Sequence, residues 1–300
     1  MTWEEANIRF VNYLKIERSL SANSVEAYDD DLHKLRQYFE YINASVVPEK
    51  VTTGQIQGFL QWINDLGMGA RSQARVLSGL RMFYKYLIFD GVIDNDPMEL
   101  VESPKIGRKL PVVLSIEEID ALIAAIDLSK PEGRRNKAII ETLYSCGLRV
   151  SELIELRYSN IFFDKGFIKV LGKGNKERLV PISNKAVKEI QQYLPDRNSM
   201  LDVMTKDSEN ILFLNNRGHK LSRVMIFTII KNLAEKIGLK KNISPHTFRH
   251  SFASHLVEGG ADLRAVQEML GHESILTTEI YTHLDRQYLR DTIIQFHPRG

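Results

Sequence analysis

The sequence has few of the features that mark several classes of protein. Cys146 is the only cysteine in 300 residues, which excludes a disulfide within the chain and fits a reducing cytosol. Because it lies in an apolar run, we expect a buried small residue and not a reactive thiol. No apolar run approaches the roughly 18 residues that span a membrane, and the acidic, mixed N-terminus is unlike a signal peptide. These absences predict a soluble cytoplasmic protein.

Excess charge is small as well. The chain has 40 lysines and arginines against 38 aspartates and glutamates, so bulk charge is only a weak indication of nucleic-acid binding. A DNA-binding face would require basic residues to be segregated on one side of the fold. With 43% hydrophobic residues, the chain is long enough for about two domains, each with its own core.

The first hundred residues show the three- and four-residue apolar spacing of amphipathic helices. We expect helices over residues 3–17, about 25–42 (capped by Ser21 or Asn23), 53–64 and 70–89. In the second of these helices the apolar residues as far as Ile42 should face inward, and in the fourth those as far as Ile88. The opposite face of the fourth helix has no carboxylate before Asp90 and carries Arg71, Arg75, Ser78, Arg81 and Lys85. This basic stripe is typical of a helix that contacts DNA, although an ordinary exposed helix can also carry it.

Residues 98–113 contain two prolines, a glycine and scattered charges without a period, which is typical of a linker. The boundary is expected near residue 105, with one domain over 1–104 and a second over 105–300. There is no internal repeat and no low-complexity tract.

The second domain mixes helices with a small sheet. Ser115 and Glu118 have the spacing of a capping box, and a helix is expected from about Arg134 to near Gly147. Three short strands separated by turn residues are predicted over 161–163, 167–171 and 178–182, and helices resume at about 183–194 and 222–237. The predicted fold class is therefore α+β: mainly α, with a small antiparallel sheet in the C-terminal domain.

Residues suited to chemistry on a phosphodiester gather between Ser244 and Tyr281. Arginine matches phosphate oxygens, histidine exchanges protons near neutral pH, and tyrosine is an oxygen nucleophile. Upstream segments add a second arginine and a lysine, and we expect one site built from His246, Arg249, His272, Tyr281, Arg149 and Lys173. Two alternatives remain open on local grounds: Arg149 pairing structurally with Glu152 or Glu155, and Lys173 as a solvated hairpin residue.

Other site types fit the sequence less well. His246 and His250 have the spacing of a zinc peptidase motif, but the residues between them lack its general-base glutamate and include Arg249, which would repel a dication. Gly172-Lys173-Gly174 lacks the spacing of a phosphate-binding P-loop. Core or capping roles are realistic for His250, His255 and His283.

The order R149-x-x-E152, K173, H246-x-x-R249, H272, Y281 resembles the tyrosine site-specific recombinase (phage integrase) family. The strings LYSCGLRVSELIEL, VLGKGNKERLVPI, SPHTFRHSFASHLVEGGADLRAVQEMLGHESILTTEIYTH and FHPRG are similar to its XerC/XerD branch, and the tail and spacing most resemble XerD. The resemblance covers the whole chain. It implies a helical, SAM-like core-binding domain followed by a tyrosine recombinase catalytic domain.

In a mechanism like that of the family, Tyr281 attacks the scissile phosphate and leaves a 3′-phosphotyrosyl link and a free 5′-hydroxyl. The resemblance implies that Arg149 and Arg249 clamp the phosphate, that Lys173 is the general acid for the leaving oxygen, and that Glu152 orients a neighbour. It also implies that His246 is an acid/base towards the tyrosine and phosphate and that His272 donates to the phosphate. It implies no metal or nucleotide cofactor.

The implied partners are a double-stranded DNA recombination site, a XerC-like recombinase in a cyclic heterotetramer and an FtsK-like DNA translocase. The implied role is resolution of chromosome dimers at cell division. The apolar tail over 286–300 buries itself either in its own domain or, as the resemblance suggests, on a neighbouring subunit. Two readings compete with this one: an integrase of a mobile element, and a catalytically silent DNA-binding or architectural protein. A type IB topoisomerase would form the same covalent adduct but would relax supercoils alone, without a site or partner.

Overall fold

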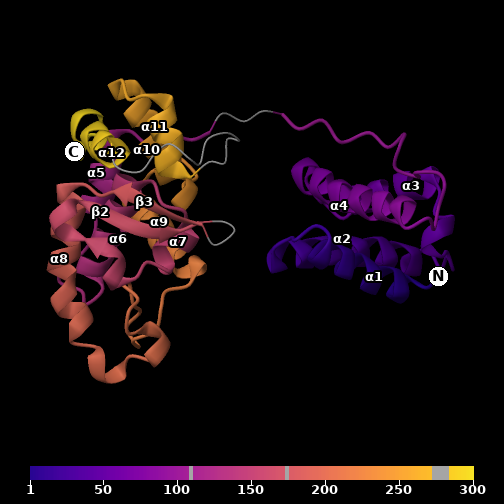
Figure 1. The fold of residues 1–300 in the computed structure, drawn as a ribbon, viewed down its shortest axis with the longest axis horizontal. Helices are drawn as coiled ribbons and strands as arrows, with labels where there is room; N and C mark the ends of the chain where they lie inside the picture. Colours follow the sequence, from indigo (N-terminus) through magenta and orange to yellow (C-terminus); the bar gives the residue numbers. More distant parts are fainter. Residues whose placement is uncertain (108–110, 173–175, 272–283) are drawn as a thin grey trace. The chain divides into compact units, whose positions relative to one another are not determined.

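The computed structural model describes residues 1–107, 111–172, 176–271 and 284–300 (Figure 1), although for residues 284–287 it describes the backbone only. The chain divides into two compact units, Met1–Lys109 and Leu110–Gly300. The division falls within the segment 98–113, a few residues after the expected position near 105. Each unit has a hydrophobic core of its own.

The N-terminal unit is helical over its described residues. Its helices are α1 (Trp3–Ile16), α2 (Ala22–Tyr41), α3 (Thr53–Asp65) and α4 (Ala70–Phe89). Ser21 caps α2 by accepting a hydrogen bond from the backbone N–H of Ser24, which confirms one of the two predicted caps. The predicted period holds along most of each helix because its apolar residues meet in one core that includes Phe10, Leu35, Phe59 and Phe83.

The predicted inward faces of α2 and α4 are wrong at their ends. Ile42 is 40% exposed because it follows the last helical residue of α2, and Ile88 is 39% exposed in the last turn of α4. The expected linker also begins too early. Met98 and Val101 are buried in the N-terminal core, so these two apolar residues anchor the start of a segment that has no periodic pattern.

The C-terminal unit confirms the predicted mixture of helices with a small sheet (Figure 1). The strands β1 (Ile161–Phe162), β2 (Phe167–Leu171) and β3 (Glu177–Pro181) pair antiparallel in the order β1-β2-β3. Ile168 lies opposite Ile161 on one side and Val180 on the other. Its described helices are α5 (Ile116–Ala124), α6 (Gly133–Cys146), α7 (Val150–Ile154), α8 (Asn184–Asn198), α9 (Arg223–Lys236), α10 (Pro245–Gly259), α11 (Leu263–Leu270) and α12 (Leu284–Phe296).

Helix α6 lies at the centre of this core, with α8 and α10 packed against it. Every residue from Ala138 to Cys146 is buried, including the polar side chains of Glu141, Thr142 and Ser145. Cys146 is fully buried, as predicted, and this burial raises the pKa of its thiol. Ser115 and Glu118 form the expected capping box at the start of α5.

The C-terminal tail packs on its own unit. Helix α12 lies against α10, α11 and β3, and its residues Leu289 and Ile293 are buried. After the helix, Arg299 pairs with Asp120 and lies 3.3 Å from the buried carboxylate of Glu141. Of the two arrangements considered for the tail, the structure therefore shows the one in which the tail is buried in its own domain.

In the described part of the chain no helix is long and apolar enough to cross a membrane. Nor do its histidine, cysteine, aspartate and glutamate side chains gather in groups of three or more that could hold a metal ion.

Candidate active site

The sharp junction between α6 and α7 directs the first arginine of the site. Gly147 ends α6 in the left-handed conformation (φ 57°), and Arg149 is the N-cap of α7. A Cβ at Gly147 would lie 2.5 Å from Cδ1 of Phe252 on α10. Glycine is therefore required here for two reasons, the backbone conformation and the close approach of α10. That approach brings Arg249, one turn before Phe252, to the same junction.

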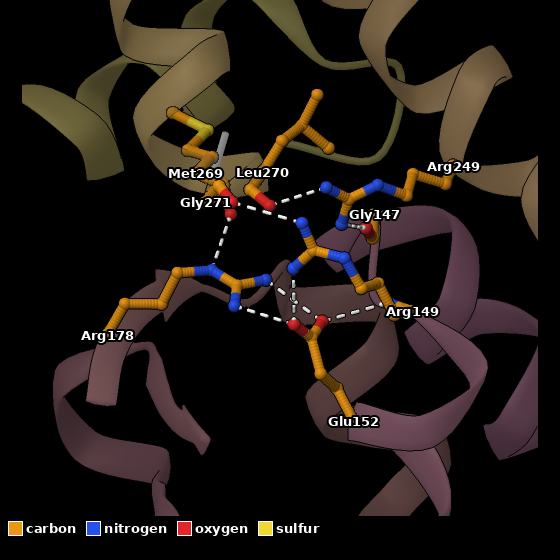
Figure 2. Close-up of polar contacts among 8 residues, drawn as sticks. All are labelled: Gly147, Arg149, Glu152, Arg178, Arg249, Met269, Leu270 and Gly271. Carbon is orange, nitrogen blue, oxygen red and sulfur yellow. Dashed lines mark hydrogen bonds and ion pairs between the residues drawn. The ribbon is translucent and has the colours of Figure 1, made fainter. Parts of the chain in front are cut away.

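Glu152 fixes Arg149 in place, as Figure 2 shows. The backbone N–H of Arg149 donates to Oε2 of Glu152 (2.9 Å), and its Nη1 donates to Oε1 (2.8 Å). The alternative of a structural pair is thus confirmed for Glu152. It does not remove Arg149 from the site, because the Arg149 side chain remains 31% exposed.

Arg249 is buried on α10 and donates from Nη1 to the carbonyl of Gly147 (2.8 Å) and from Nη2 to the carbonyl of Leu270. Burial, followed by the positive charge of Arg149, lowers the pKa of its guanidinium to about 10. Arg249 therefore stays charged at neutral pH. Its charge lies close enough to that of Arg149 for the two to repel.

Three arginines hold the C-terminal end of α11, one carbonyl each (Figure 2). Arg178 donates to Met269 (3.0 Å), Arg249 to Leu270, and Arg149 to Gly271 (3.0 Å). These carbonyls have no partner within the helix, and the helix dipole makes this end negative, so cations stabilise it. The next residue is His272, so the three arginines orient the chain that leads to it.

Glu152 is the common carboxylate of the cluster. Burial by itself raises its pKa, but the hydrogen bonds and charge of Arg178, followed by the contacts of Arg149, hold that pKa below its ordinary value. Glu152 is therefore ionised at neutral pH. Its side chain is only 2% exposed, so it acts on the arginines and not on solvent.

The structure brings together Arg149, Glu152 and Arg249 of the predicted site. His246 is exposed in the first turn of α10, one turn before Arg249 on the same helix. Lys173, His272 and Tyr281 lie outside the described residues, so their predicted places stay predictions.

The other predicted histidine roles differ from one another. His255 is buried and its Nδ1 lies 2.7 Å from the hydroxyl of Tyr144, so it has a core role. His250 is exposed and lies inside α10, which leaves no core or capping role for it. His283 lies outside the described residues.

The basic stripe of α4 contains two arginines with structural partners. Arg75 pairs with Asp31, a carboxylate that α2 contributes, and Arg81 donates to the carbonyl of Val101 and the hydroxyl of Ser103 (2.9 Å). Lys85 and Arg71 are exposed on the same helix. The sequence showed no carboxylate on this face because Asp31 comes from another helix.

Arg178 is the site residue that the sequence argument missed. It lies at the start of β3, two positions before the buried Val180 and on the same face of the strand. A charged residue on the buried face of a strand needs a partner, so the inward-facing position of this arginine in the predicted strand was the signal that could have identified it. The partner, Glu152, comes from another element, so the strand pattern alone does not identify it.

Comparison with known proteins agrees with this architecture. The chain matches the phage integrase family over residues 113–288 and the phage integrase N-terminal SAM-like domain over residues 8–91. It is 41% identical over 291 residues to the tyrosine recombinase XerD of Listeria innocua serovar 6a, covering 97% of this chain and 98% of that protein. It is 43% identical over 302 residues to the tyrosine recombinase XerD of Chlorobaculum tepidum, covering 99% and 98%.

Solved structures show the same fold at lower identity. The Tn1549 transposon integrase in complex with circular intermediate DNA matches with a TM-score of 0.74 at 19% identity, covering 96% of this chain and 98% of that one. The XerH site-specific recombinase bound to palindromic difH substrate matches with a TM-score of 0.70 at 23% identity, covering 95% and 83%. The chain therefore belongs to the phage integrase family and is a XerD-like site-specific tyrosine recombinase, an enzyme that cleaves and rejoins DNA.

Proposed function

We propose that this recombinase resolves chromosome dimers at cell division, by exchanging strands at a chromosomal site through a 3′-phosphotyrosyl intermediate. The proposal is supported by full-length relatives at 41–43% identity that are named tyrosine recombinase XerD. Its substrate is a double-stranded DNA recombination site. The XerH and Tn1549 integrase structures, which hold DNA on the same fold, support this substrate class.

The observation that carries the proposed chemistry is the pairing of Arg149 with Arg249. They are about 100 residues apart in the chain, yet each donates to one of two adjacent carbonyls, Gly271 and Leu270. Two fixed guanidiniums side by side suit a phosphate whose non-bridging oxygens gain charge in the transition state. Both are held before DNA binds, so little reorganisation is needed during the reaction.

In the proposed reaction the hydroxyl oxygen of Tyr281 forms a bond to the scissile phosphorus, and the bond from phosphorus to the 5′-oxygen breaks. Lys173 gives a proton to the leaving 5′-oxygen, and His246 accepts the tyrosine proton. His272 donates to a non-bridging oxygen, and Glu152 orients Arg149. Rejoining reverses these steps with the 5′-hydroxyl of another strand, and no metal or nucleotide cofactor takes part.

The N-terminal unit supplies further DNA contacts in this proposal. Arg71 and Lys85 are exposed on α4 and suit direct contact with phosphates. Arg75 and Arg81 act mainly through their partners within the unit, although both retain some exposure.

The proposed assembly is a cyclic heterotetramer on DNA with a XerC-like recombinase, in the cytoplasm, under control of an FtsK-like translocase. In that assembly the tail over 286–300 docks on a neighbouring subunit. Its exposed apolar residues Tyr288 and Ile294 support this part of the proposal, because they remain uncovered when the tail packs on its own unit. A chain truncated at residue 285 should lose synapsis, and intact synapsis and cleavage would contradict the docking.

The chemistry is tested with a covalent trap. The target site is first recovered by sequencing the DNA cross-linked to the Tyr281→Phe protein, and a duplex with a nick near the cleavage point is then made from it. The wild-type protein should form a covalent protein–DNA adduct. The Tyr281→Phe protein should bind the same duplex and form none, and an adduct with this variant would show that the nucleophile is misassigned.

A second candidate function is integration of a mobile element by the same chemistry. It is the nearer alternative because a transposon integrase, that of Tn1549, shares this fold, with a TM-score of 0.74 at 19% identity. The recovered DNA site distinguishes the two functions: one chromosomal locus supports dimer resolution, whereas the ends of an element support integration.

A further inference from the structure

Arg178 uses all three of its guanidinium nitrogens inside the protein (Figure 2). Its Nη1 donates to Oε1 of Glu152 (2.7 Å), its Nη2 donates to Oε2 (2.9 Å), and its Nε donates to the carbonyl of Met269 (3.0 Å). The side chain is only 15% exposed. It is therefore a fixed bridge between α7 and the end of α11.

Two arginines share the carboxylate of Glu152. Oε1 accepts from the Nη1 atoms of both Arg149 and Arg178, and Oε2 accepts from the Arg149 backbone N–H and from Arg178 Nη2. The two-point contact of Arg178 sets the plane of the carboxylate. Without this contact, the Glu152 carboxylate could rotate about its Cγ–Cδ bond, and Arg149, which donates to the carboxylate, would move as well.

The other end of the bridge lies against the chain that leads to His272. A Cβ at Gly271 would lie 3.0 Å from Nε of Arg178 and 3.1 Å from its Cδ and Cζ atoms. The carbonyl of the same glycine accepts from Arg149. Arg178 thus contacts both supports of Arg149, the carboxylate of Glu152 and the turn from Met269 to Gly271.

We infer that Arg178 is a positioning residue for strand cleavage: it sets the direction of Arg149 through Glu152 and the start of the segment that carries His272 through Met269. In this role it acts through contacts within the protein and needs no contact with DNA. Arg178 also lies on β3, the strand that follows Lys173 in the sequence. The inference rests on the proposed roles of Arg149 and His272.

The test is single-turnover cleavage of the nicked duplex described above, at saturating protein, with DNA affinity and thermal unfolding measured in parallel. Arg178→Lys keeps a cation beside Glu152 but cannot make the two-point contact. We expect its cleavage rate to fall about 10- to 100-fold with DNA affinity nearly unchanged, because misplacement of a catalytic group acts on the chemical step. Glu177→Gln, at the exposed neighbouring position, should cleave at the wild-type rate.

A double-mutant cycle separates positioning from general damage. If Arg178 acts through Arg149, then Arg178→Lys should slow cleavage by a much smaller factor in the Arg149→Lys protein than in the wild-type protein. Full additivity of the two losses would overturn the inference. So would a wild-type rate for Arg178→Lys.

A second variant covers failure to fold. Should Arg178→Lys unfold, the pair Glu152→Gln with Arg178→Gln removes both buried charges together, and we expect it to fold and to cleave slowly. Wild-type cleavage by this pair would overturn the inference. Absence of an adduct with the wild-type protein would instead contradict the proposed function, so the two failures are distinguishable.

Discussion

The ring of Phe252 occupies the space into which a side chain at Gly147 would point, with Cδ1 2.5 Å from an ideal Cβ position. This contact lets α10 approach the end of α6 and places the carbonyl of Gly147 within 2.8 Å of Nη1 of Arg249. The packing of one aromatic ring on one glycine thus helps to place Arg249, one half of the proposed phosphate clamp.

Gly147→Ala should destabilise the C-terminal unit more than glycine replacement at an uncrowded site. The matched control is Gly238→Ala, since Gly238 also has positive φ (65°) but no atom within 4 Å of its Cβ position. Conformational strain should cost about 1–2 kcal/mol at either position, and crowding should add about 1–3 kcal/mol at Gly147. Urea unfolding measures both, and equal losses would show that Phe252 moves aside freely.

Arg249→Lys should cleave the nicked duplex about 10²–10³-fold more slowly than wild type at saturating protein. A lysine ammonium cannot contact the carbonyls of Gly147 and Leu270 and also present a planar fork to phosphate. Arg134→Lys is the matched control, because that arginine is 54% exposed and pairs with Asp196. A loss of less than about threefold would contradict a role for Arg249 in the clamp.

The stability of the N-terminal unit should depend on pH through Asp31. Burial raises the pKa of this carboxyl to about 6, against an ordinary value of 3.8, even though the charge of Arg75 lowers it. The folded state then binds more protons than the unfolded state between about pH 4 and pH 6, so the free energy of unfolding should fall as pH rises, by at most about 1.4 kcal/mol per unit. Above about pH 6 the contribution levels off.

Asp31→Asn lacks this titration and should gain stability relative to wild type as pH rises through that window. Denaturant unfolding of both proteins at pH 4, 5, 6 and 7 measures the difference. The opposite trend would mean that the ion pair with Arg75 outweighs the cost of burial.

Arg71→Ala and Lys85→Ala should each weaken DNA binding and reduce the slope of log affinity against log salt by about 1. Neither should change thermal unfolding, because both side chains are exposed. Arg75→Ala should mainly destabilise the unit by leaving Asp31 buried without its guanidinium partner. Unchanged salt slopes for Arg71→Ala and Lys85→Ala would remove α4 from the DNA interface.

Local patterns predicted the elements well because each depends on neighbours in the chain. The period of α4, the Ser21 cap and the Ser115–Glu118 capping box follow from residues within a few positions of one another. The position of Arg149 at a helix junction was also predictable, since Gly147 ends one helix and the next begins at Val150. Resemblance to a family supplied the roles of the residues, which no local pattern contains.

The relationships that the sequence did not show join distant elements. Asp31 partners Arg75 from another helix, Arg178 reaches Glu152 across 26 residues, and three arginines meet at the end of α11. Such contacts depend on how helices pack, and packing has no signature within a window of a few residues. An inward-facing charge such as Arg178 indicates only that some partner exists.

Of the three arginines at the end of α11, Arg149 and Arg178 bond the carboxylate of Glu152, whereas Arg249 donates to carbonyls, so positive charge exceeds negative charge by two among these four residues. Burial is the main cause of the lowered pKa of Arg249, and the charges of Arg149 and Arg178 also lower it, so these two arginines repel Arg249. The free enzyme therefore holds unfavourable electrostatic energy that an anion relieves. Sulfate or inorganic phosphate should raise the unfolding temperature of the C-terminal unit beyond the effect of chloride at equal ionic strength, and DNA would displace either ion.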